Sequence, residues 1–207
     1  MTREKRHWIE LLSERIASRV AKKQGLDRKS FLKMKLGLET FLINVTKGAV
    51  VYGLSILLGT FLITLVTHLG FLMLRRYSYG LHAKSSVFCT ATSILFFNVS
   101  PLLLRGLNLT ISPLIFMGGG AVLLYLVHRY APADTEKNPF ASLEKISKLR
   151  HASVRMTALL LVASFFLPMY QPFIYLGLVC QVVMIHPLTY KILGRGYANY
   201  EKLIMGT

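Results

Sequence analysis

Carboxylates are scarce in this sequence. There are 9 aspartates and glutamates against 25 lysines and arginines, and none of them occurs between Thr40 and Ala133. The gap excludes the paired aspartates of an intramembrane aspartyl protease from this long apolar region, and the chain has neither an HExxH zinc motif nor a GxSG-like serine motif. The formal charge of +16 favours an anionic partner, such as lipid headgroups or an acidic peptide. We do not expect nucleic acid as the partner of a chain this apolar.

Cysteine is also rare. The two cysteines, Cys89 and Cys180, argue against a disulfide framework. Cys180 lies in the apolar run IYLGLVCQVVMI, where a packing role is expected. Several histidines lie outside the central stretch described below and show no metal-ligand spacing, so we expect neither a metal nor another cofactor; they are His68, His128, His151 and His186.

Charged residues make up only 16% of the chain and hydrophobic residues 53%. Several apolar runs approach the length that crosses a bilayer of about 30 Å, so the composition predicts an all-α, polytopic membrane protein. The first forty residues are strongly charged rather than apolar, so no cleavable signal peptide is expected.

The amino-terminal segment Met1–Gln24 is amphipathic, with Trp8, Leu12 and Ile16 recurring at three- and four-residue steps between basic side chains. This pattern predicts a basic helix that lies in the membrane interface and ends at Gly25. We therefore divide the chain into an interfacial segment, residues 1–30, and a single transmembrane catalytic domain, residues 31–207.

The predicted crossings number four to six. The run Thr40–Leu74 is long for one upright helix and short for two, so it forms either two crossings with a turn near Gly53 or Gly59, or one long broken element. The remaining crossings are predicted at Val87–Leu104, Pro113–Val127, Met156–Met169 and Phe173–Ile185. A polar, basic loop, His128–Arg155, separates the middle pair from the last pair.

Lysine and arginine also predict the orientation in the cell membrane. They concentrate in the amino-terminal region, in Arg75–Lys84, in the His128–Arg155 loop and in the tail. By the positive-inside rule these segments are cytoplasmic, so both termini lie inside and the number of crossings is even.

The chemistry-bearing residues concentrate in Arg75–Cys89 (RRYSYGLHAKSSVFC). His82 is the base nearest to Cys89 in sequence and would generate a thiolate there, which makes Cys89 the predicted nucleophile. On one unbroken helix, residues seven apart lie about 10 Å apart along the axis, too far for proton transfer. The chain must therefore bend between them. Gly80 eases a turn, and a helix capped by Ser85 or Ser86 would place Cys89 in its first turn, where the helix dipole favours a thiolate.

Other polar residues of this region have two interpretations each. Arg75 and Arg76 either grip a substrate carboxylate or anchor the topology, and Lys84 adds positive charge near the thiol. Glu39 either orients His82, pairs with Arg75, or balances nearby lysines at the interface.

Three segments in this order resemble the accessory gene regulator protein B family, membrane cysteine endopeptidases of Gram-positive quorum sensing. Along the chain they are KLGLETFLINVTK (Lys35–Lys47), RRYSYGLHAKSSVFC (Arg75–Cys89), with the family's arginine, Gly–x–His–Ala and cysteine, and YAPADTEKNP (Tyr130–Pro139). The last departs from the family's usual run of lysines before the proline.

The resemblance implies that Cys89 is the nucleophile, that His82 is the base, and that Glu39, Arg75 and Gly80 support them. Proteins like this remove the carboxy-terminal tail of a propeptide that has an amphipathic leader and an acidic tail. A thioester acyl-enzyme forms, and the peptide cyclises to a thiolactone or lactone. Family analogy also implies a homodimer. The alternative function is a non-enzymatic membrane protein, such as a transporter subunit or a scaffold that binds anionic lipids.

Overall fold

The computed structural model describes residues 8–81, 86–107, 112–135, 139–140 and 142–201. The regular elements of these residues are helices. Tyr79 and Ala133 form an isolated β-bridge that is not part of a strand. The prediction of an all-α fold is therefore confirmed.

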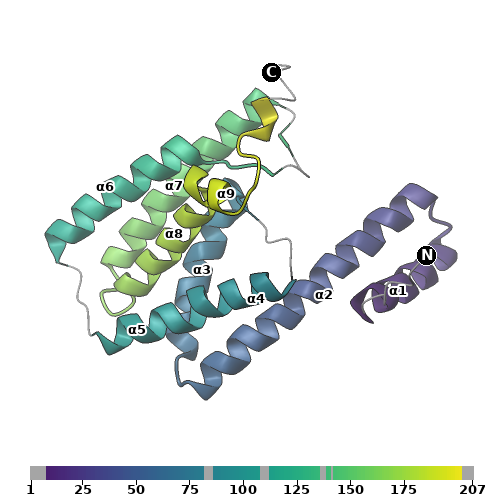
Figure 1. Ribbon diagram of the computed structural model, residues 1–207, viewed down its shortest axis with the longest axis horizontal. Helices are drawn as coiled ribbons and strands as arrows, with labels where there is room; N and C mark the ends of the chain where they lie inside the picture. The colour runs from purple at the N-terminus through teal and green to yellow at the C-terminus, as the bar shows by residue number, and fades with distance from the viewer. Residues whose placement is uncertain (1–7, 82–85, 108–111, 136–138, 141, 202–207) are drawn as a thin grey trace. The chain divides into compact units, whose positions relative to one another are not determined.

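Figure 1 labels the helices in their order along the chain. They are α1 (Trp8–Gln24), α2 (Arg28–Leu57), α3 (Phe61–Ser78), α4 (Ser86–Ile94), the π-helix η1 (Leu95–Val99), α5 (Ser100–Gly106), α6 (Pro113–Tyr130), α7 (Leu143–Phe165), α8 (Gln171–Ile185) and α9 (Pro187–Ile192).

Glycines in the left-handed region mark two of the breaks. Gly25 has φ +61° and follows α1, as predicted, and Gly59 has φ +62° between α2 and α3. Only glycine adopts this conformation without a steric cost. The apolar run Thr40–Leu74 is thus divided between two helices at Gly59, whereas Gly53 lies inside α2.

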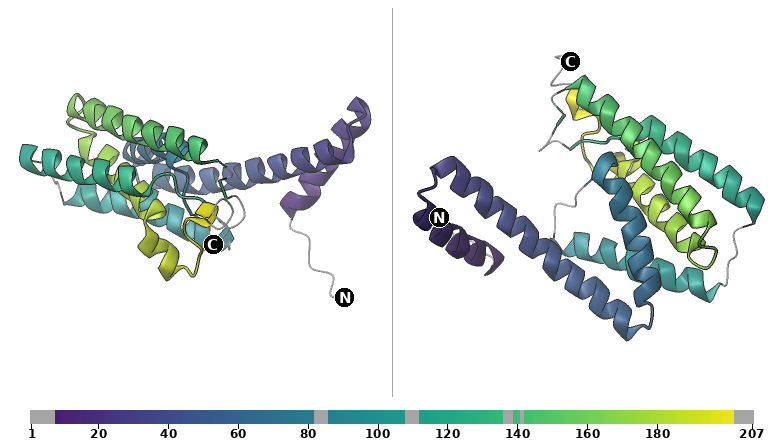
Figure 2. Two further views of the ribbon diagram at one scale, coloured as in Figure 1. Left: turned by 90° about the horizontal axis from the view of Figure 1, so that it is seen from above. Right: turned by 180° about the vertical axis from the view of Figure 1, so that it is seen from behind.

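The elements α4, η1 and α5 form one continuous rod, which Figure 2 shows from two further sides. Pro101 lies just after η1 and has no N–H to donate to the carbonyl four residues earlier. A wider π-turn relieves this conflict, and the Ser100 backbone N–H donates to the Leu95 carbonyl.

Among the described residues, two helical stretches are long and apolar enough to cross a membrane: Arg28–Leu57 and Val87–Gly106. The predicted crossing at Val87–Leu104 corresponds to the second of them. Helix α8 is apolar but shorter. The number of crossings, four to six, stays a prediction.

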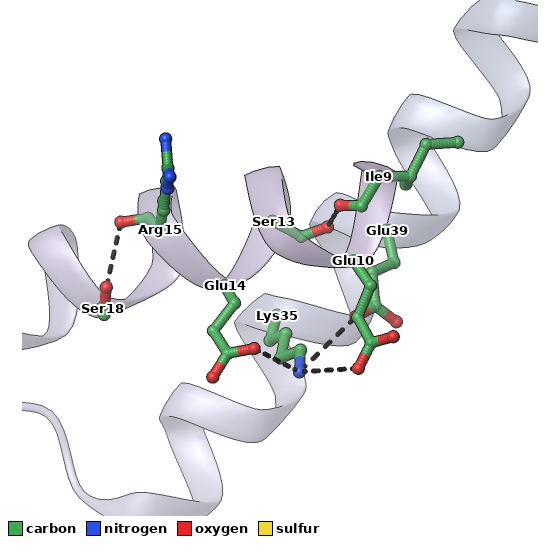
Figure 3. Close-up of polar contacts among 8 residues, drawn as sticks. All are labelled: Ile9, Glu10, Ser13, Glu14, Arg15, Ser18, Lys35 and Glu39. Carbon is green, nitrogen blue, oxygen red and sulfur yellow. Dashed lines mark hydrogen bonds and ion pairs between the residues drawn. The ribbon is translucent and has the colours of Figure 1, made fainter. Parts of the chain in front are cut away.

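The described residues group into two compact units, Met1–Gly53 and Leu54–Thr207. In the first unit, Lys35 of α2 forms ion pairs with Glu10 and Glu14 of α1 at 3.6 and 3.3 Å, and with Glu39 at 3.9 Å (Figure 3). One lysine thus pairs with three carboxylates and links the two helices. These units are groups of contacting residues rather than functional domains, and the division into residues 1–30 and 31–207 stays a prediction.

Helix α8 is central to the second unit, where it contacts α3, α5, α6, α7 and α9. Much of its surface is buried, including Cys180, as predicted for a packing residue. Helices α3 and α8 approach closely at Gly70 and Gly177, where a Cβ on Gly177 would lie 2.9 Å from the Phe71 backbone nitrogen. Small residues at a crossing are what allow two helix backbones to come this close.

Replacing Gly177 by alanine should destabilise this unit. The added methyl group would meet backbone atoms of α3, which cannot move aside as a flexible side chain would, and overpacking of this kind costs about 1–3 kcal/mol. The thermal melting temperature of the detergent-purified protein should fall. Gly118→Ala in α6 is the matched control, because a Cβ there meets nothing within 4 Å. Equal melting temperatures for the two variants would contradict the packing argument.

The predicted basic loop His128–Arg155 is wrong in extent. Helix α6 continues to Tyr130, and α7 begins at Leu143, after an N-cap in which the Ser142 hydroxyl accepts from the Lys145 N–H at 3.5 Å. The buried face of α7 begins with Ile146, Ser153 and Thr157. Small polar residues at helical spacing leave no apolar stripe in the sequence, and the basic residues between them suggested a loop.

Candidate active site

The polypeptide turns sharply at the end of α3. Tyr79 has φ 55° and Gly80 has φ 113°, a region that strongly favours glycine. A Cβ on Gly80 would lie 2.8 Å from the Met184 carbonyl oxygen and 3.1 Å from a methyl group of Ile185. The glycine is therefore required both by the backbone conformation and by the close approach of α8.

Helix α3 ends at Ser78, and α4 begins at Ser86. The bend predicted between His82 and Cys89 falls partly on residues outside the described part of the chain and stays a prediction. His82 and Lys84 lie outside the described residues.

Cys89 is the fourth residue of α4 and lies in its first turn, as predicted. Its side chain is partly exposed, in contrast to that of Cys180. The first turn of a helix carries the partial positive charge of unpaired N–H groups, which favours an anion at this position.

Arg75 binds the turn that precedes His82. Its Nη1 donates to the Tyr79 carbonyl at 3.2 Å, and its Nη2 donates to the carbonyls of Gly80 and Leu81 at 3.3 and 2.8 Å. A further bond from Nη1 reaches the Gln181 side chain at 3.3 Å. Four of the five guanidinium N–H donors are thus engaged with protein groups.

The electrostatic surroundings link Arg75 to the cysteine. Burial lowers the pKa of the Arg75 guanidinium from its ordinary value, while the negative charges that Tyr190 and Cys89 can carry raise it. The Cys89 side chain therefore lies within electrostatic range of the Arg75 guanidinium.

Gln181 belongs to this arrangement, although the sequence analysis missed it. It lies in apolar α8, its side chain is fully buried, and its Nε2 donates to the Tyr79 carbonyl and the Ser78 hydroxyl at 2.6 and 2.7 Å. A lone amide inside the run LVCQVVMI is the signal that could have identified it, because an amide buried among apolar side chains is costly unless it is hydrogen-bonded.

The YAPAD segment that carries the resemblance packs against the same turn. The Ala133 N–H donates to the Ser78 carbonyl, and the Gly80 N–H donates to the Ala133 carbonyl, each at 2.9 Å. The next residue, Asp134, is buried, and its carboxylate accepts from the backbone N–H groups of Asn199 and Tyr200 at 2.9 and 2.7 Å. The carboxy-terminal segment is thereby tied to the turn.

Alkaline pH should destabilise the packing of the carboxy-terminal segment, which includes Tyr197. Burial, together with the charges of Tyr200 and Tyr130, raises the pKa of the Tyr197 phenol from 10.0 to about 12. The unfolded phenol ionises near pH ~10, so this contribution to stability is complete below that pH and is lost as pH rises towards 12. The free energy of unfolding in detergent should fall over this interval, and Tyr197→Phe should flatten the fall. An unchanged pH slope would contradict the assignment.

Two other predicted site residues, Arg76 and Glu39, have contacts of their own. Arg76 is exposed, with its guanidinium carbon 6.0 Å from the centre of the Tyr77 ring. Glu39 is paired with Lys35 in the first unit, and its relation to His82 stays a prediction. The described residues contain no cluster of three metal-binding side chains.

Similar proteins are known from sequence. The family model for accessory gene regulator B matches residues 13–185. An AgrB-like protein of Listeria innocua is 40% identical over 195 residues, covering 92% of this chain and 95% of that protein. Accessory gene regulator protein B of Staphylococcus intermedius is 35% identical, covering 84% of this chain and 92% of that protein. No solved structure matches. The chain therefore belongs to the accessory gene regulator B family.

Proposed function

We propose that this protein is a membrane cysteine endopeptidase of quorum sensing that removes the carboxy-terminal tail of a propeptide. The observation that carries the proposal is the break between α3 and α4, which places Cys89 in the first turn of a helix just after a tightly held turn leading to His82. The Arg75 guanidinium, whose charge interacts with Cys89, adds to the support.

The reaction proceeds by acyl transfer. The Cys89 thiolate attacks the carbonyl carbon of the scissile peptide bond, the carbon–nitrogen bond breaks, and His82 passes its proton to the leaving amine of the tail. A thioester joins Cys89 to the remaining peptide. A nucleophilic side chain within the bound peptide then attacks the thioester carbonyl, which releases a cyclic thiolactone or lactone and restores the thiolate.

The remaining residues support the reacting pair. Arg75 and Gly80 shape the turn, which is a structural use of the arginine rather than a grip on substrate. Arg76 and Lys84 supply positive charge for an acidic tail. We propose Glu39, in the first unit, as a supporting carboxylate.

The net charge of +16 suits a propeptide with an acidic tail and a membrane rich in anionic lipids. The amphipathic pattern of α1 suits an interfacial position beside the propeptide leader. We propose that the reaction takes place at the cytoplasmic face of the cell membrane, where both termini lie, and that the protein acts as a homodimer.

Coexpression with the propeptide tests the proposal. Cells that carry both proteins should release a tail fragment and a cyclic peptide, identified by mass spectrometry, and cells that carry the propeptide alone should release neither. Absence of cleavage while the protein is present in the membrane would overturn the proposal and favour a transporter subunit or a lipid-binding scaffold.

A further inference from the structure

Gln181 forms all of its side-chain hydrogen bonds with the end of α3 and the turn that follows it. Its side chain has no exposed surface, although the helix around it is apolar. The amide makes three hydrogen bonds: its Nε2 donates to the Tyr79 carbonyl and the Ser78 hydroxyl, and its Oε1 accepts from Arg75. All three partners lie in the last turn of α3 or directly after it.

The orientation of this amide is determined by its partners. A guanidinium can only donate, so it must face Oε1, and a backbone carbonyl can only accept, so it must face Nε2. Gln181 therefore contacts a donor and an acceptor at the same time. An apolar side chain can satisfy neither group, and a carboxylate can accept from Arg75 but cannot donate to Tyr79.

These bonds secure the three residues that precede His82. The Tyr79 carbonyl accepts from both Gln181 and Arg75, and Arg75 also holds the carbonyls of Gly80 and Leu81. In addition, the Leu81 N–H donates to the Met184 carbonyl at 3.1 Å, so that α8 holds the segment through both side chain and backbone. His82 follows Leu81 by a single peptide bond.

We propose that Gln181 is a positioning residue for the endopeptidase reaction, acting through Arg75 and the Tyr79 carbonyl on the backbone that leads into His82. This inference rests on the proposed function. An error of about 1 Å in the placement of a catalytic group can lower the rate by on the order of 10²-fold. A buried amide that fixes the backbone before His82 would therefore have a large effect on the rate.

The test uses Gln181→Met in a Cys180→Ala background, where Cys89 is the remaining thiol. Methionine preserves most of the volume and removes all three hydrogen bonds. The kcat for propeptide cleavage should fall by on the order of 10²-fold while KM stays close to that of the parent. The melting temperature should also fall, because buried partners lose their hydrogen bonds. The pH profile of Cys89 alkylation should shift towards that of His82→Ala.

Val182→Ala is the matched control. Val182 is the next residue of α8 and is buried, so its truncation costs packing but removes no hydrogen bond to the turn. Its melting temperature should fall while kcat and the alkylation profile are retained. If Gln181→Met does not accumulate in the membrane, Gln181→Glu replaces it, because it keeps the shape and still cannot donate to Tyr79.

A parental kcat in Gln181→Met would overturn the inference. So would a loss of kcat that follows the melting temperature and leaves the alkylation profile unaltered. The alkylation measurement needs no propeptide. If the unaltered protein fails to cleave the propeptide, the proposed function fails, and the alkylation profile still decides whether Gln181 positions the turn.

Discussion

Cells that coexpress the propeptide with Cys89→Ala or with His82→Ala should accumulate uncut propeptide, with cleavage reduced to background in both cases. Alanine at position 89 removes the sulfur that forms the acyl-enzyme, and alanine at position 82 removes the base that generates the thiolate and protonates the leaving amine. Residues that act as one unit show losses of similar size when removed singly. The measurement is mass spectrometry of the propeptide, with immunoblotting to confirm equal amounts of protein in the membrane.

Cys180→Ala is the control for Cys89→Ala. Cys180 is a buried packing residue of α8, so its replacement tests the loss of a thiol without loss of the predicted nucleophile. Cleavage should persist in this variant. Cleavage in Cys89→Ala, or its loss in Cys180→Ala at an unchanged amount of membrane protein, would show that the nucleophile has been assigned to the wrong residue.

Gly80→Ala should lower the cleavage rate by on the order of 10²-fold, because a displaced turn misplaces the residue that follows it. Two physical effects act together. The backbone φ of 113° is strained for alanine, and its Cβ would lie 2.8 Å from the Met184 carbonyl oxygen, so Tyr79–Leu81 must move away from α8. The rate should be measured on purified protein in detergent, with the melting temperature recorded beside it.

Gly59→Ala separates strain from displacement. Gly59 also has a left-handed φ, +62°, but a Cβ there meets nothing within 4 Å. This variant should lose about 1 kcal/mol of stability and keep its cleavage rate. If the two alanine variants lose rate equally, the contact with Met184 is not what makes Gly80 necessary.

Much of the candidate site could be predicted from sequence because its signals are local. Gly80 eases a turn, serine before Val87 favours the start of a helix, and a base and a thiol lie seven positions apart. These features predicted a bend after His82 and a cysteine in the first helical turn, and Cys89 does lie in the first turn of α4. The long apolar run Thr40–Leu74 was harder, because its composition allowed one or two elements, and the left-handed Gly59 decided between them.

The prediction of a basic loop at His128–Arg155 shows where local signals mislead. The buried face of α7 begins with an isoleucine followed by small polar residues, so hydropathy along the chain does not reveal the helix. A helix can bury serine and threonine because their hydroxyls bond to its own carbonyls, as those of Ser153 and Thr157 do.

The sequence by itself determined the family of the chain, its helical class, and which residues bring a thiol, a base and positive charge to one stretch, because these depend on residue identity and short spacing. Only the tertiary structure showed that Arg75 binds the carbonyls of the turn and that Gln181 bonds to Arg75. These two residues are 106 positions apart along the chain. Neither residue reveals its partner locally. The contact exists because Gly70 and Gly177 let α3 and α8 approach closely, and the buried amide and guanidinium must then satisfy each other and the carbonyls of the turn.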